Sequence, residues 1–171
     1  MPAGIEFVLN GQSVCVPDCP THLTLLEYLR CRGLTGSKEG CAEGDCGACS
    51  VAIIERDSQG KPVYRAINSC LTPLCLMAGR EVISVEGVAR CGALHPVQQE
   101  MVAHHGSQCG YCTPGFILSL FEGYYRDDIC TNDQLDDQIC GNLCRCTGYR
   151  PIRDAAIASF PERHRRNGQD A

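Results

Sequence analysis

Eight of the fifteen cysteines form two groups of four with different spacing. The first group has gaps of four, two and twenty residues and consists of Cys41, Cys46, Cys49 and Cys70. The second group joins a C-x-x-C pair to a C-x-C pair across 31 residues and consists of Cys109, Cys112, Cys144 and Cys146. Each group requires that separate loops converge on one centre. These groups therefore restrict the fold and the function more than any other feature.

The first group has the spacing of a plant-type ferredoxin. A C-x4-C-x2-C run with a distant fourth cysteine binds a 2Fe–2S cluster in those proteins, and the second group implies a second redox centre. Two redox centres on a chain of 171 residues indicate a relay for electrons rather than a catalyst of bond chemistry. We predict no residue that acts as a general acid, a general base or a nucleophile, so no catalytic residue is expected.

Zinc and disulfides are the alternatives for these cysteines. Structural zinc sites usually have C-x2–4-C spacing on both sides, and the C-x-C pair at Cys144 and Cys146 departs from that pattern. Disulfides would leave one of the fifteen cysteines over and would strain the dense loop 41–49. Gly47 and Gly110 stand between cysteines and suit close approach of the backbone to inorganic sulfide. Iron–sulfur binding is the better interpretation of both groups.

Composition and charge exclude several classes of function. The formal net charge is −5 and no basic stripe is present, so nucleic-acid binding is not expected. The N-terminus does not have the pattern of a signal peptide, and no apolar run approaches the ~18 residues of a membrane span. Intracellular chains rich in cysteine more often bind metal than form disulfides. We therefore expect a cytoplasmic protein whose thiols are reduced.

The N-terminal part combines strands, a short helix and a glycine-rich loop. Strands are predicted over residues 5–9, 13–16, 50–55, 62–67 and 81–87. Asn10-Gly11 is a strong signal for a two-residue hairpin turn, and Thr24 with Glu27 forms a capping box that opens the helix. We predict a β-grasp, ferredoxin-like 2Fe–2S domain over residues 1–87.

The C-terminal part changes to helices. Four short helices are predicted, with the sequences HPVQQEMVAHH, GFILSLFEGYY, QLDDQI and IRDAAIASF. Pro96 and Pro114 suit the first turn of a helix, and Thr131 begins a second capping box. A four-helix bundle over residues 88–160 would place helix N-termini beside the second cysteine group and stabilise its negative charge. The predicted fold class is α+β, and residues 161–171 are expected to form a polar tail or linker.

The motifs around the cysteines resemble those of one enzyme family. GCAEGDCGAC (40–49) with NSC (68–70), QCGYCTPG (108–115) and GNLCRCTGYRPI (141–152) are similar to the iron–sulfur subunit of the molybdenum hydroxylases. That family contains xanthine dehydrogenase, aldehyde oxidase and bacterial three-part enzymes for carbon monoxide, isoquinoline and hydroxybenzoyl-CoA. The resemblance covers about residues 4–160 and includes both cysteine groups, their glycines and their order.

The resemblance implies cofactors and partners. One 2Fe–2S cluster would lie in each domain, molybdenum–molybdopterin on a large catalytic subunit, and FAD on a further subunit or domain. The cluster of the helical domain would lie nearest the molybdopterin, and the N-terminal cluster would lie toward FAD. Gln108, directly before Cys109, matches the family glutamine that hydrogen-bonds the pterin, and a side-chain amide offers both a donor and an acceptor. A hetero-oligomer is expected, such as a dimer of heterotrimers.

The expected function is electron transfer in an oxidoreductase complex. Electrons would leave the molybdenum centre singly, pass both clusters and reach FAD, then NAD or another acceptor. EGDCGAC and HPVQQEMVAHHGSQCGYCTPGF resemble bacterial xanthine dehydrogenase small subunits, so xanthine or another purine is the expected substrate. An aldehyde, carbon monoxide or N-heterocycle enzyme and a free-standing two-cluster ferredoxin are the alternatives. Because an FAD domain is often fused in the xanthine branch, the chain is expected to be either a separate subunit or a fragment.

Further cysteines and two histidines need a simpler interpretation. The cysteines outside the two groups are Cys15, Cys19, Cys31, Cys75, Cys91, Cys130 and Cys140. We expect them to be small buried apolar side chains or idle thiols. His104 and His105 are interpreted as a polar pair at a helix end, because adjacent helical residues point about 100° apart.

Overall fold

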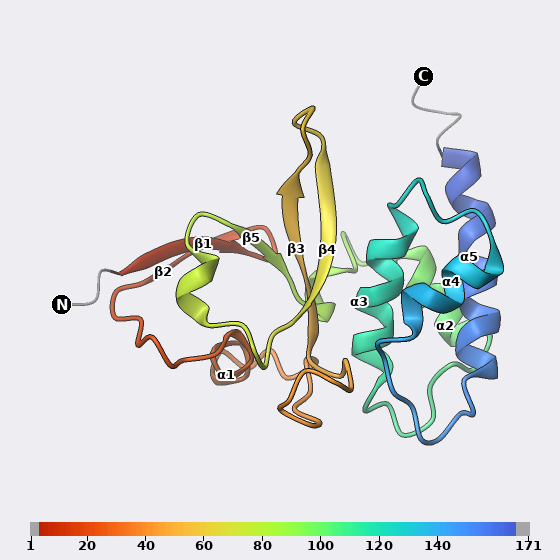
Figure 1. The fold of residues 1–171 in the computed structure, drawn as a ribbon, viewed down its shortest axis with the longest axis horizontal. Coiled ribbons are helices and arrows are strands. Elements are labelled where there is room, and N and C mark those ends of the chain that lie inside the picture. The colour runs from red at the N-terminus through yellow and green to blue at the C-terminus, as the bar shows by residue number, and fades with distance from the viewer. Residues whose placement is uncertain (1–3, 167–171) are drawn as a thin grey trace.

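The computed structural model describes the backbone of residues 4–166 and the side chains of residues 4–160. Figure 1 shows two lobes: the sheet lobe, which contains the five strands and helix α1, and the helical lobe, which contains helices α2 to α5. Among the described residues, no helix is long and apolar enough to cross a membrane. The α+β fold predicted from the sequence is confirmed, with a ferredoxin-like sheet followed by helices.

The sheet has the strand order β2-β1-β5-β3-β4. The strands are β1 (Ile5–Leu9), β2 (Gln12–Val16), β3 (Ser50–Arg56), β4 (Pro62–Asn68) and β5 (Glu81–Ile83). β1 runs parallel to β5, and the other neighbouring strands are antiparallel. The turn between β1 and β2 has positive φ at both Asn10 and Gly11, as a two-residue type I′ hairpin requires. The predicted hairpin is therefore confirmed.

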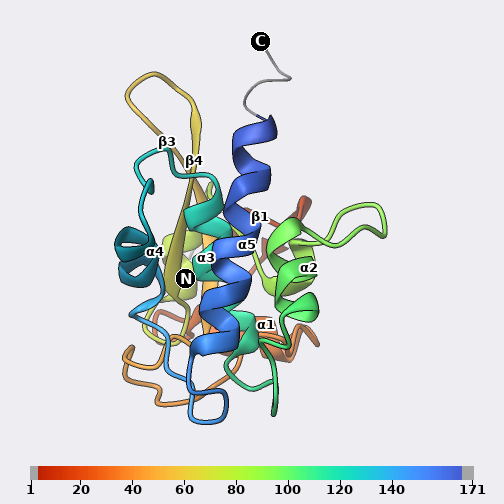
Figure 2. The ribbon, with the colours of Figure 1, turned by 90° about the vertical axis from the view of Figure 1, so that its right-hand side faces the viewer.

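The helices begin where the capping residues predicted them. The α-helices are α1 (Leu25–Cys31), α2 (Pro96–Ala103), α3 (Thr113–Tyr124), α4 (Asn132–Ile139) and α5 (Arg150–Arg166). The capping boxes of Thr24 and Thr131 are both formed, and His95 caps α2 in the same way. Figure 2 shows α5 in front, with α4 and α2 on either side and α3 behind it.

Two predicted boundaries differ from the structure. The last strand was expected to reach residue 87, but β5 ends at Ile83 because the Ser84 N–H donates to the Asn10 side chain instead of the sheet. A 3-10 turn, η2 (Val85–Gly87), follows. Helix α5 continues to Arg166, beyond the point where the polar tail was expected to begin, and residues 167–171 lie outside the described part.

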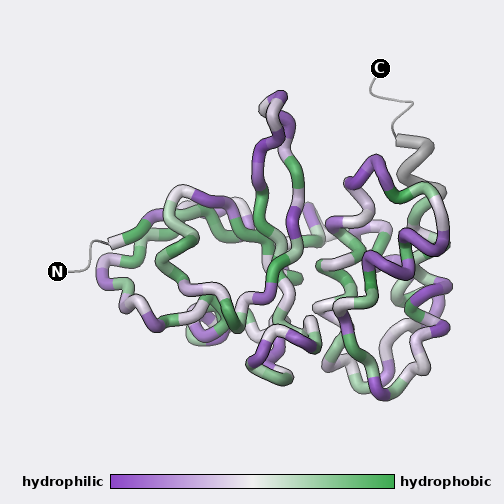
Figure 3. The backbone as a smooth tube through the Cα atoms, viewed as in Figure 1, coloured by the Kyte–Doolittle hydropathy of each residue, from purple (hydrophilic) through white to green (hydrophobic). Residues whose placement is uncertain are grey.

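Strand β3 is buried on both faces and contributes to two apolar cores. Val51 and Ile53 pack with β1, α1 and the 3-10 turn η1 (Leu74–Met77), whereas Ala52 packs with the helical lobe. Alternate residues of a strand point to opposite faces, so neighbouring residues of β3 enter different cores. Strand β3 contacts α3, and both elements contain apolar stretches, which are green in Figure 3. The two lobes therefore share one strand instead of meeting through a loose linker.

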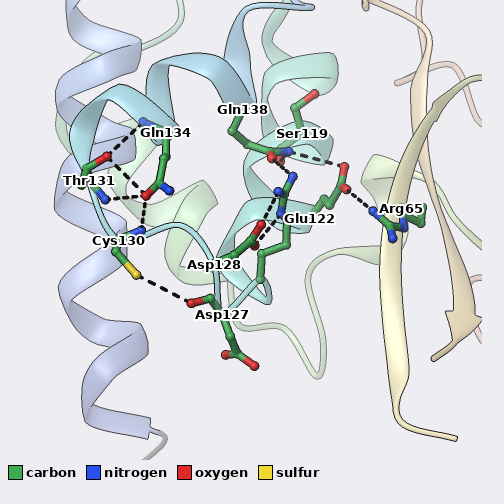
Figure 4. A network of polar contacts seen from close by, with 10 residues as sticks. Arg65, Ser119, Glu122, Asp127, Asp128, Cys130, Thr131, Gln134 and Gln138 are labelled. Carbon is green, nitrogen blue, oxygen red and sulfur yellow. Dashed lines mark hydrogen bonds and ion pairs between the residues drawn. The ribbon is translucent and has the colours of Figure 1, made fainter. Parts of the chain in front are cut away.

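A buried carboxylate joins the two lobes on the β4 side. Glu122 of α3 is 9% exposed, and its Oε2 accepts hydrogen bonds from the Ala66 N–H of β4 (3.0 Å) and from Gln138 Nε2 of α4 (3.4 Å). Arg65 Nη1 lies 3.9 Å from the other carboxylate oxygen (Figure 4). Arg126 extends the network by donating to Gln138 Oε1. A buried charge is tolerated when it is paired and hydrogen-bonded in this way.

We expect Glu122→Ala to lower the free energy of unfolding by about 2–4 kcal/mol, because it removes charge-assisted hydrogen bonds and leaves a part-buried N–H without an acceptor. Glu100→Ala is the matched control, since among the described side chains the Glu100 carboxylate makes only an i,i+4 pair with the exposed His104, worth about 0.3–0.5 kcal/mol. Denaturant titration of the metal-loaded chain measures both. Equal losses in the two variants would contradict this role for Glu122.

Candidate metal centres

Both cysteine groups lie on loops at the same edge of the molecule, the lower edge in Figures 1 and 2. In the first group, three thiols come from the loop before β3 and the fourth from the turn after β4. In the second group, Cys112 is the N-cap residue of α3, and the C-x-C pair lies in the loop before α5. The fold therefore places each predicted set of four cysteines on neighbouring loops at this edge.

The thiols of the first group are arranged as two pairs. Cys49 Sγ and Cys70 Sγ lie 3.3 Å apart, and the Cys41 and Cys46 thiols hydrogen-bond each other. An electrostatic interaction between Cys70 and Cys41 connects the pairs. Two pairs suit a 2Fe–2S cluster, in which each iron takes two of the four protein thiolates.

The second group repeats this arrangement. The Cys109 thiol hydrogen-bonds the Cys146 thiol, and the Cys112 thiol hydrogen-bonds the Cys144 thiol. Each pair thus joins one cysteine of the C-x-x-C motif to one of the C-x-C motif. Within the described residues, no three His, Cys, Asp or Glu side chains are grouped as ligands of a single metal ion. A tetrahedral zinc site would need four ligands around one point.

Backbone N–H groups surround the sulfur of Cys41, in the glycine-rich loop before β3. The Glu43 N–H donates to Cys41 Sγ at 3.4 Å. This bond, with further N–H donors from Cys46 and Asp45, lowers the pKa of Cys41 to about 7. Gly40 makes the close packing possible, because a Cβ there would lie 2.7 Å from Cys46 Sγ. Such N–H donors suit the negative charge of thiolates that hold iron.

Burial acts on other thiols in the opposite direction. It raises the pKa of Cys70 to about 11 and that of Cys112 to about 12, and the adjacent Cys49 and Cys144 thiols add to the effect. Burial of Cys144 is outweighed by hydrogen bonds from the Thr147 hydroxyl and backbone, which lower its pKa. Protonated thiols must lose their protons before they bind metal. The donor set fits an anionic iron–sulfur group that replaces those protons.

The two loops that carry the groups contact each other directly. The Leu143 N–H donates to the Cys46 carbonyl at 3.0 Å, and the Tyr111 hydroxyl donates to the Glu39 carbonyl. Neither contact was predicted from the sequence. The only local signal is that Leu143 directly precedes Cys144 and that Tyr111 lies between Cys109 and Cys112.

The two predicted glycines have different roles. Gly47 has φ +67°, and a Cβ there would lie 2.6 Å from the Gly141 carbonyl, so its close neighbour is the loop of the second group. Gly110 has φ +81°, and a Cβ would meet only Ser107 Oγ at 3.8 Å. At Gly110 the left-handed backbone, not lack of space, accounts for the glycine.

The remaining candidates lie at the surface or outside the groups. Gln108 is exposed beside the exposed Cys109. His104 and His105 directly follow the last residue of α2, which confirms a polar pair at a helix end. The seven other cysteines were expected to be small buried side chains or idle thiols. Cys19 is buried and Cys75 is half-buried, whereas the exposed ones are Cys15, Cys31, Cys91, Cys130 and Cys140.

Comparison with known proteins agrees with this geometry. Residues 7–75 match the family described as 2Fe-2S iron-sulfur cluster binding domain, and residues 84–157 match the [2Fe-2S] binding domain family. A chain of quinoline 2-oxidoreductase from Pseudomonas putida 86 is 32% identical with a TM-score of 0.79, and the match covers 95% of this chain and 96% of that one. The chain belongs to the iron–sulfur components of the molybdenum hydroxylases.

Longer proteins contain the same molybdenum hydroxylase component. Aldehyde oxidoreductase from Desulfovibrio gigas is 34% identical with a TM-score of 0.79, and the match covers 97% of this chain but 17% of that one. Xanthine dehydrogenase 1 of Arabidopsis thaliana is 49% identical over 150 residues, and xanthine dehydrogenase/oxidase of Mus musculus is 45% identical over 150 residues. In both, the match covers 86% of this chain and 11% of the relative. The component thus occurs both as a separate chain and as part of longer ones.

We expect Cys41 of the metal-free chain to be alkylated far faster than Cys70. At about pH 8, a thiol of pKa about 7 is mostly thiolate, whereas roughly a thousandth of a thiol of pKa about 11 is. Iodoacetamide labelling followed by peptide mass spectrometry measures the two rates. Raising the pH from about 8 to about 10 should accelerate Cys70 but hardly Cys41. Equal rates would mean that the N–H donors leave Cys41 when iron is absent.

Proposed function

We propose that this chain carries electrons, one at a time, from a molybdenum–pterin centre on a large partner chain to FAD on a further chain or domain. The acceptor beyond FAD is NAD or another oxidant. The observation that carries the proposal is that two cysteine groups, each arranged as two thiol pairs, lie on loops that contact each other. A bound 2Fe–2S cluster supplies a centre that accepts one electron with little rearrangement.

We assign the first cluster to residues 1–87 and the second to residues 88–160. The ligands of the first are Cys41, Cys46, Cys49 and Cys70, and those of the second are Cys109, Cys112, Cys144 and Cys146. One iron of each cluster would be held by each thiol pair. The start of α3 at Thr113 supports the second assignment, because the positive end of a helix dipole lies beside Cys112 and stabilises negative charge.

Electrons enter at the second group and leave at the first. The exposed Gln108, Cys109 and Cys146 support entry from a partner at this surface. The Gln108 amide contacts the pterin there, since it presents a donor and an acceptor that a pterin edge complements. The contact between Leu143 and Cys46 then gives the electron a bonded route to the first group.

The partner's substrate is proposed to be xanthine or another purine. Xanthine dehydrogenases match this chain at 49% and 45% identity, whereas the structures of the quinoline and aldehyde enzymes match at 32% and 34%. Substrate contacts would belong to the partner chain, so the substrate assignment depends only on the similarity of this chain to xanthine dehydrogenases. The assembly is a hetero-oligomer, for which a dimer of heterotrimers is the proposed form.

We expect Cys112→Ser to abolish one of two distinct paramagnetic signals of the reduced chain and to stop turnover with the physiological acceptor. The variant removes one of four thiolates of the second cluster and leaves the first group intact. Low-temperature electron paramagnetic resonance measures the signals. Cys31→Ser, at an exposed cysteine that ends α1, is the matched control and should keep both signals. Two unchanged signals in Cys112→Ser would disprove the ligand assignment.

We expect the chain, isolated gently from cells that express it, to remain bound to a larger chain that contains molybdenum, together with FAD. Metal analysis and the visible spectrum of the complex provide the measurement, and the purified chain alone should be brown. Oxidation of xanthine in preference to aldehydes or quinoline by the complex tests the substrate. A brown chain without molybdenum or flavin partners would instead indicate a free-standing two-cluster ferredoxin, and a colourless chain that contains zinc would exclude both.

A further inference from the structure

The two cysteine loops meet at a junction built from backbone and one amide side chain. Asn142 Nδ2 donates to the Gly47 carbonyl at 3.2 Å, directly beside the hydrogen bond from the Leu143 N–H to the Cys46 carbonyl. Gly47 follows Cys46, and Leu143 precedes Cys144. Consecutive residues of one loop therefore bind consecutive carbonyls of the other, and each pair of residues borders a cysteine that we assign to a cluster.

The junction leaves no space for side chains between the loops. A Cβ at Gly47 would lie 2.3 Å from Asn142 Nδ2, and a Cβ at Gly115 of α3 would lie 2.1 Å from the Gly47 carbonyl oxygen. Heavy atoms that are not bonded cannot approach so closely. Even one added methyl group at either glycine would therefore force the loops apart. Only bare backbone at these positions allows the hydrogen bonds to form.

Asn142 lies in this junction at a cost to stability. Its side chain is 3% exposed, and among the described residues its Oδ1 has no hydrogen-bond partner. A buried acceptor without a partner is destabilising, and an apolar side chain of similar size would avoid that penalty. The reversed amide would place two acceptors against each other at the Gly47 carbonyl, so the N–H group must face that carbonyl. The presence of asparagine at position 142 is therefore explained by the hydrogen bond that its side-chain N–H donates, and not by packing.

We propose that Asn142 is a positioning residue that sets the rate of electron passage between the two cysteine groups. It holds the Cys46–Gly47 peptide against the Asn142–Leu143 peptide, and Gly115 supplies the clearance. The route runs from Cys144 along the chain to Leu143, across the hydrogen bond to the Cys46 carbonyl, and through the backbone of Cys46 to its Sγ. One electron passes, so one centre is oxidised as the other is reduced, and no proton crosses. This inference rests on the proposed function, because it requires both clusters.

The physical reason is that electron tunnelling is much faster through bonds and short hydrogen bonds than across an open gap. When a hydrogen bond on the route lengthens into a gap, electron transfer therefore becomes slower although neither cluster changes. The clusters keep their own ligands in this case, and their individual spectra stay the same. A slower electron transfer between the clusters, with unchanged spectra of each cluster, thus distinguishes a positioning role from a purely structural one.

The test compares Asn142→Leu and Gly115→Ala with the parent chain, all loaded with iron and sulfide. Asn142→Leu removes the donor but fills the space, and it should leave the melting temperature equal or higher because the unsatisfied acceptor is also removed. We expect both variants to slow electron transfer between the clusters, measured after rapid one-electron reduction, by roughly tenfold or more. Displacements of about 1 Å have effects up to roughly a hundredfold on steps that depend on geometry. Asn132→Leu, at an exposed position of α4, is the matched control and should change neither the rate of electron transfer nor the melting temperature.

A second measurement does not depend on the clusters. Hydrogen exchange of the peptide that spans residues 141–149 should accelerate in both variants, because the Leu143 N–H loses its acceptor. The magnetic interaction between the two reduced clusters should weaken in parallel. Unchanged exchange in Asn142→Leu, or a transfer rate within about twofold of the parent in both variants, would overturn the inference. A parent chain that binds no iron, or only one cluster, would refute the proposed function instead.

Discussion

The position of both cysteine groups depends on the packing of helix α3 against strand β3. Strand β3 begins directly after Cys49, and α3 begins directly after Cys112. Ala52 of β3 is fully buried in the same core as Phe116 of α3. Because the helix packs on the strand in this way, the loops that lead into the two elements emerge at the same edge of the molecule. The separation of the two groups is thus determined by the apolar contact between β3 and α3, against which Cys112 and Cys144 also pack.

Polar contacts between the lobes maintain the packing of α3 on β3 at two places in the interface. On the β4 side, Glu122 binds the backbone of Ala66 and so prevents the edge strand from separating from α3. At the loop edge, Asn142 and Leu143 bind the carbonyls of Gly47 and Cys46. The first contact is a buried charge that stabilises, whereas the second includes an amide whose oxygen has no hydrogen-bond partner in the described part of the chain. Stability and electron transfer therefore have separate residues in the same interface.

The thiols show how local hydrogen bonding prepares the groups for iron. The loop around Cys41 offers N–H groups that lower its pKa to about 7, while burial raises the pKa of Cys70 to about 11. Before metal binds, the Cys41 thiol is thus mostly ionised only above a pH of about 7, whereas the Cys70 thiol of the same group retains its proton. The charge that four thiolates would concentrate is accepted only when iron arrives, since metal binding releases the remaining protons.

The sequence by itself determined the local features of this protein. The turn at Asn10-Gly11 and the capping boxes of Thr24 and Thr131 are each encoded within a few residues, and the two cysteine groups follow a specific spacing, so spacing and residue type were enough to predict them. The early end of β5 was missed because the Ser84 N–H binds Asn10, 74 residues away in the chain. The same holds for Asn142 and Gly47, which are 95 residues apart. Only the tertiary structure decided that the two cysteine loops contact each other, because that contact arises when α3 packs on β3 and not from either loop alone.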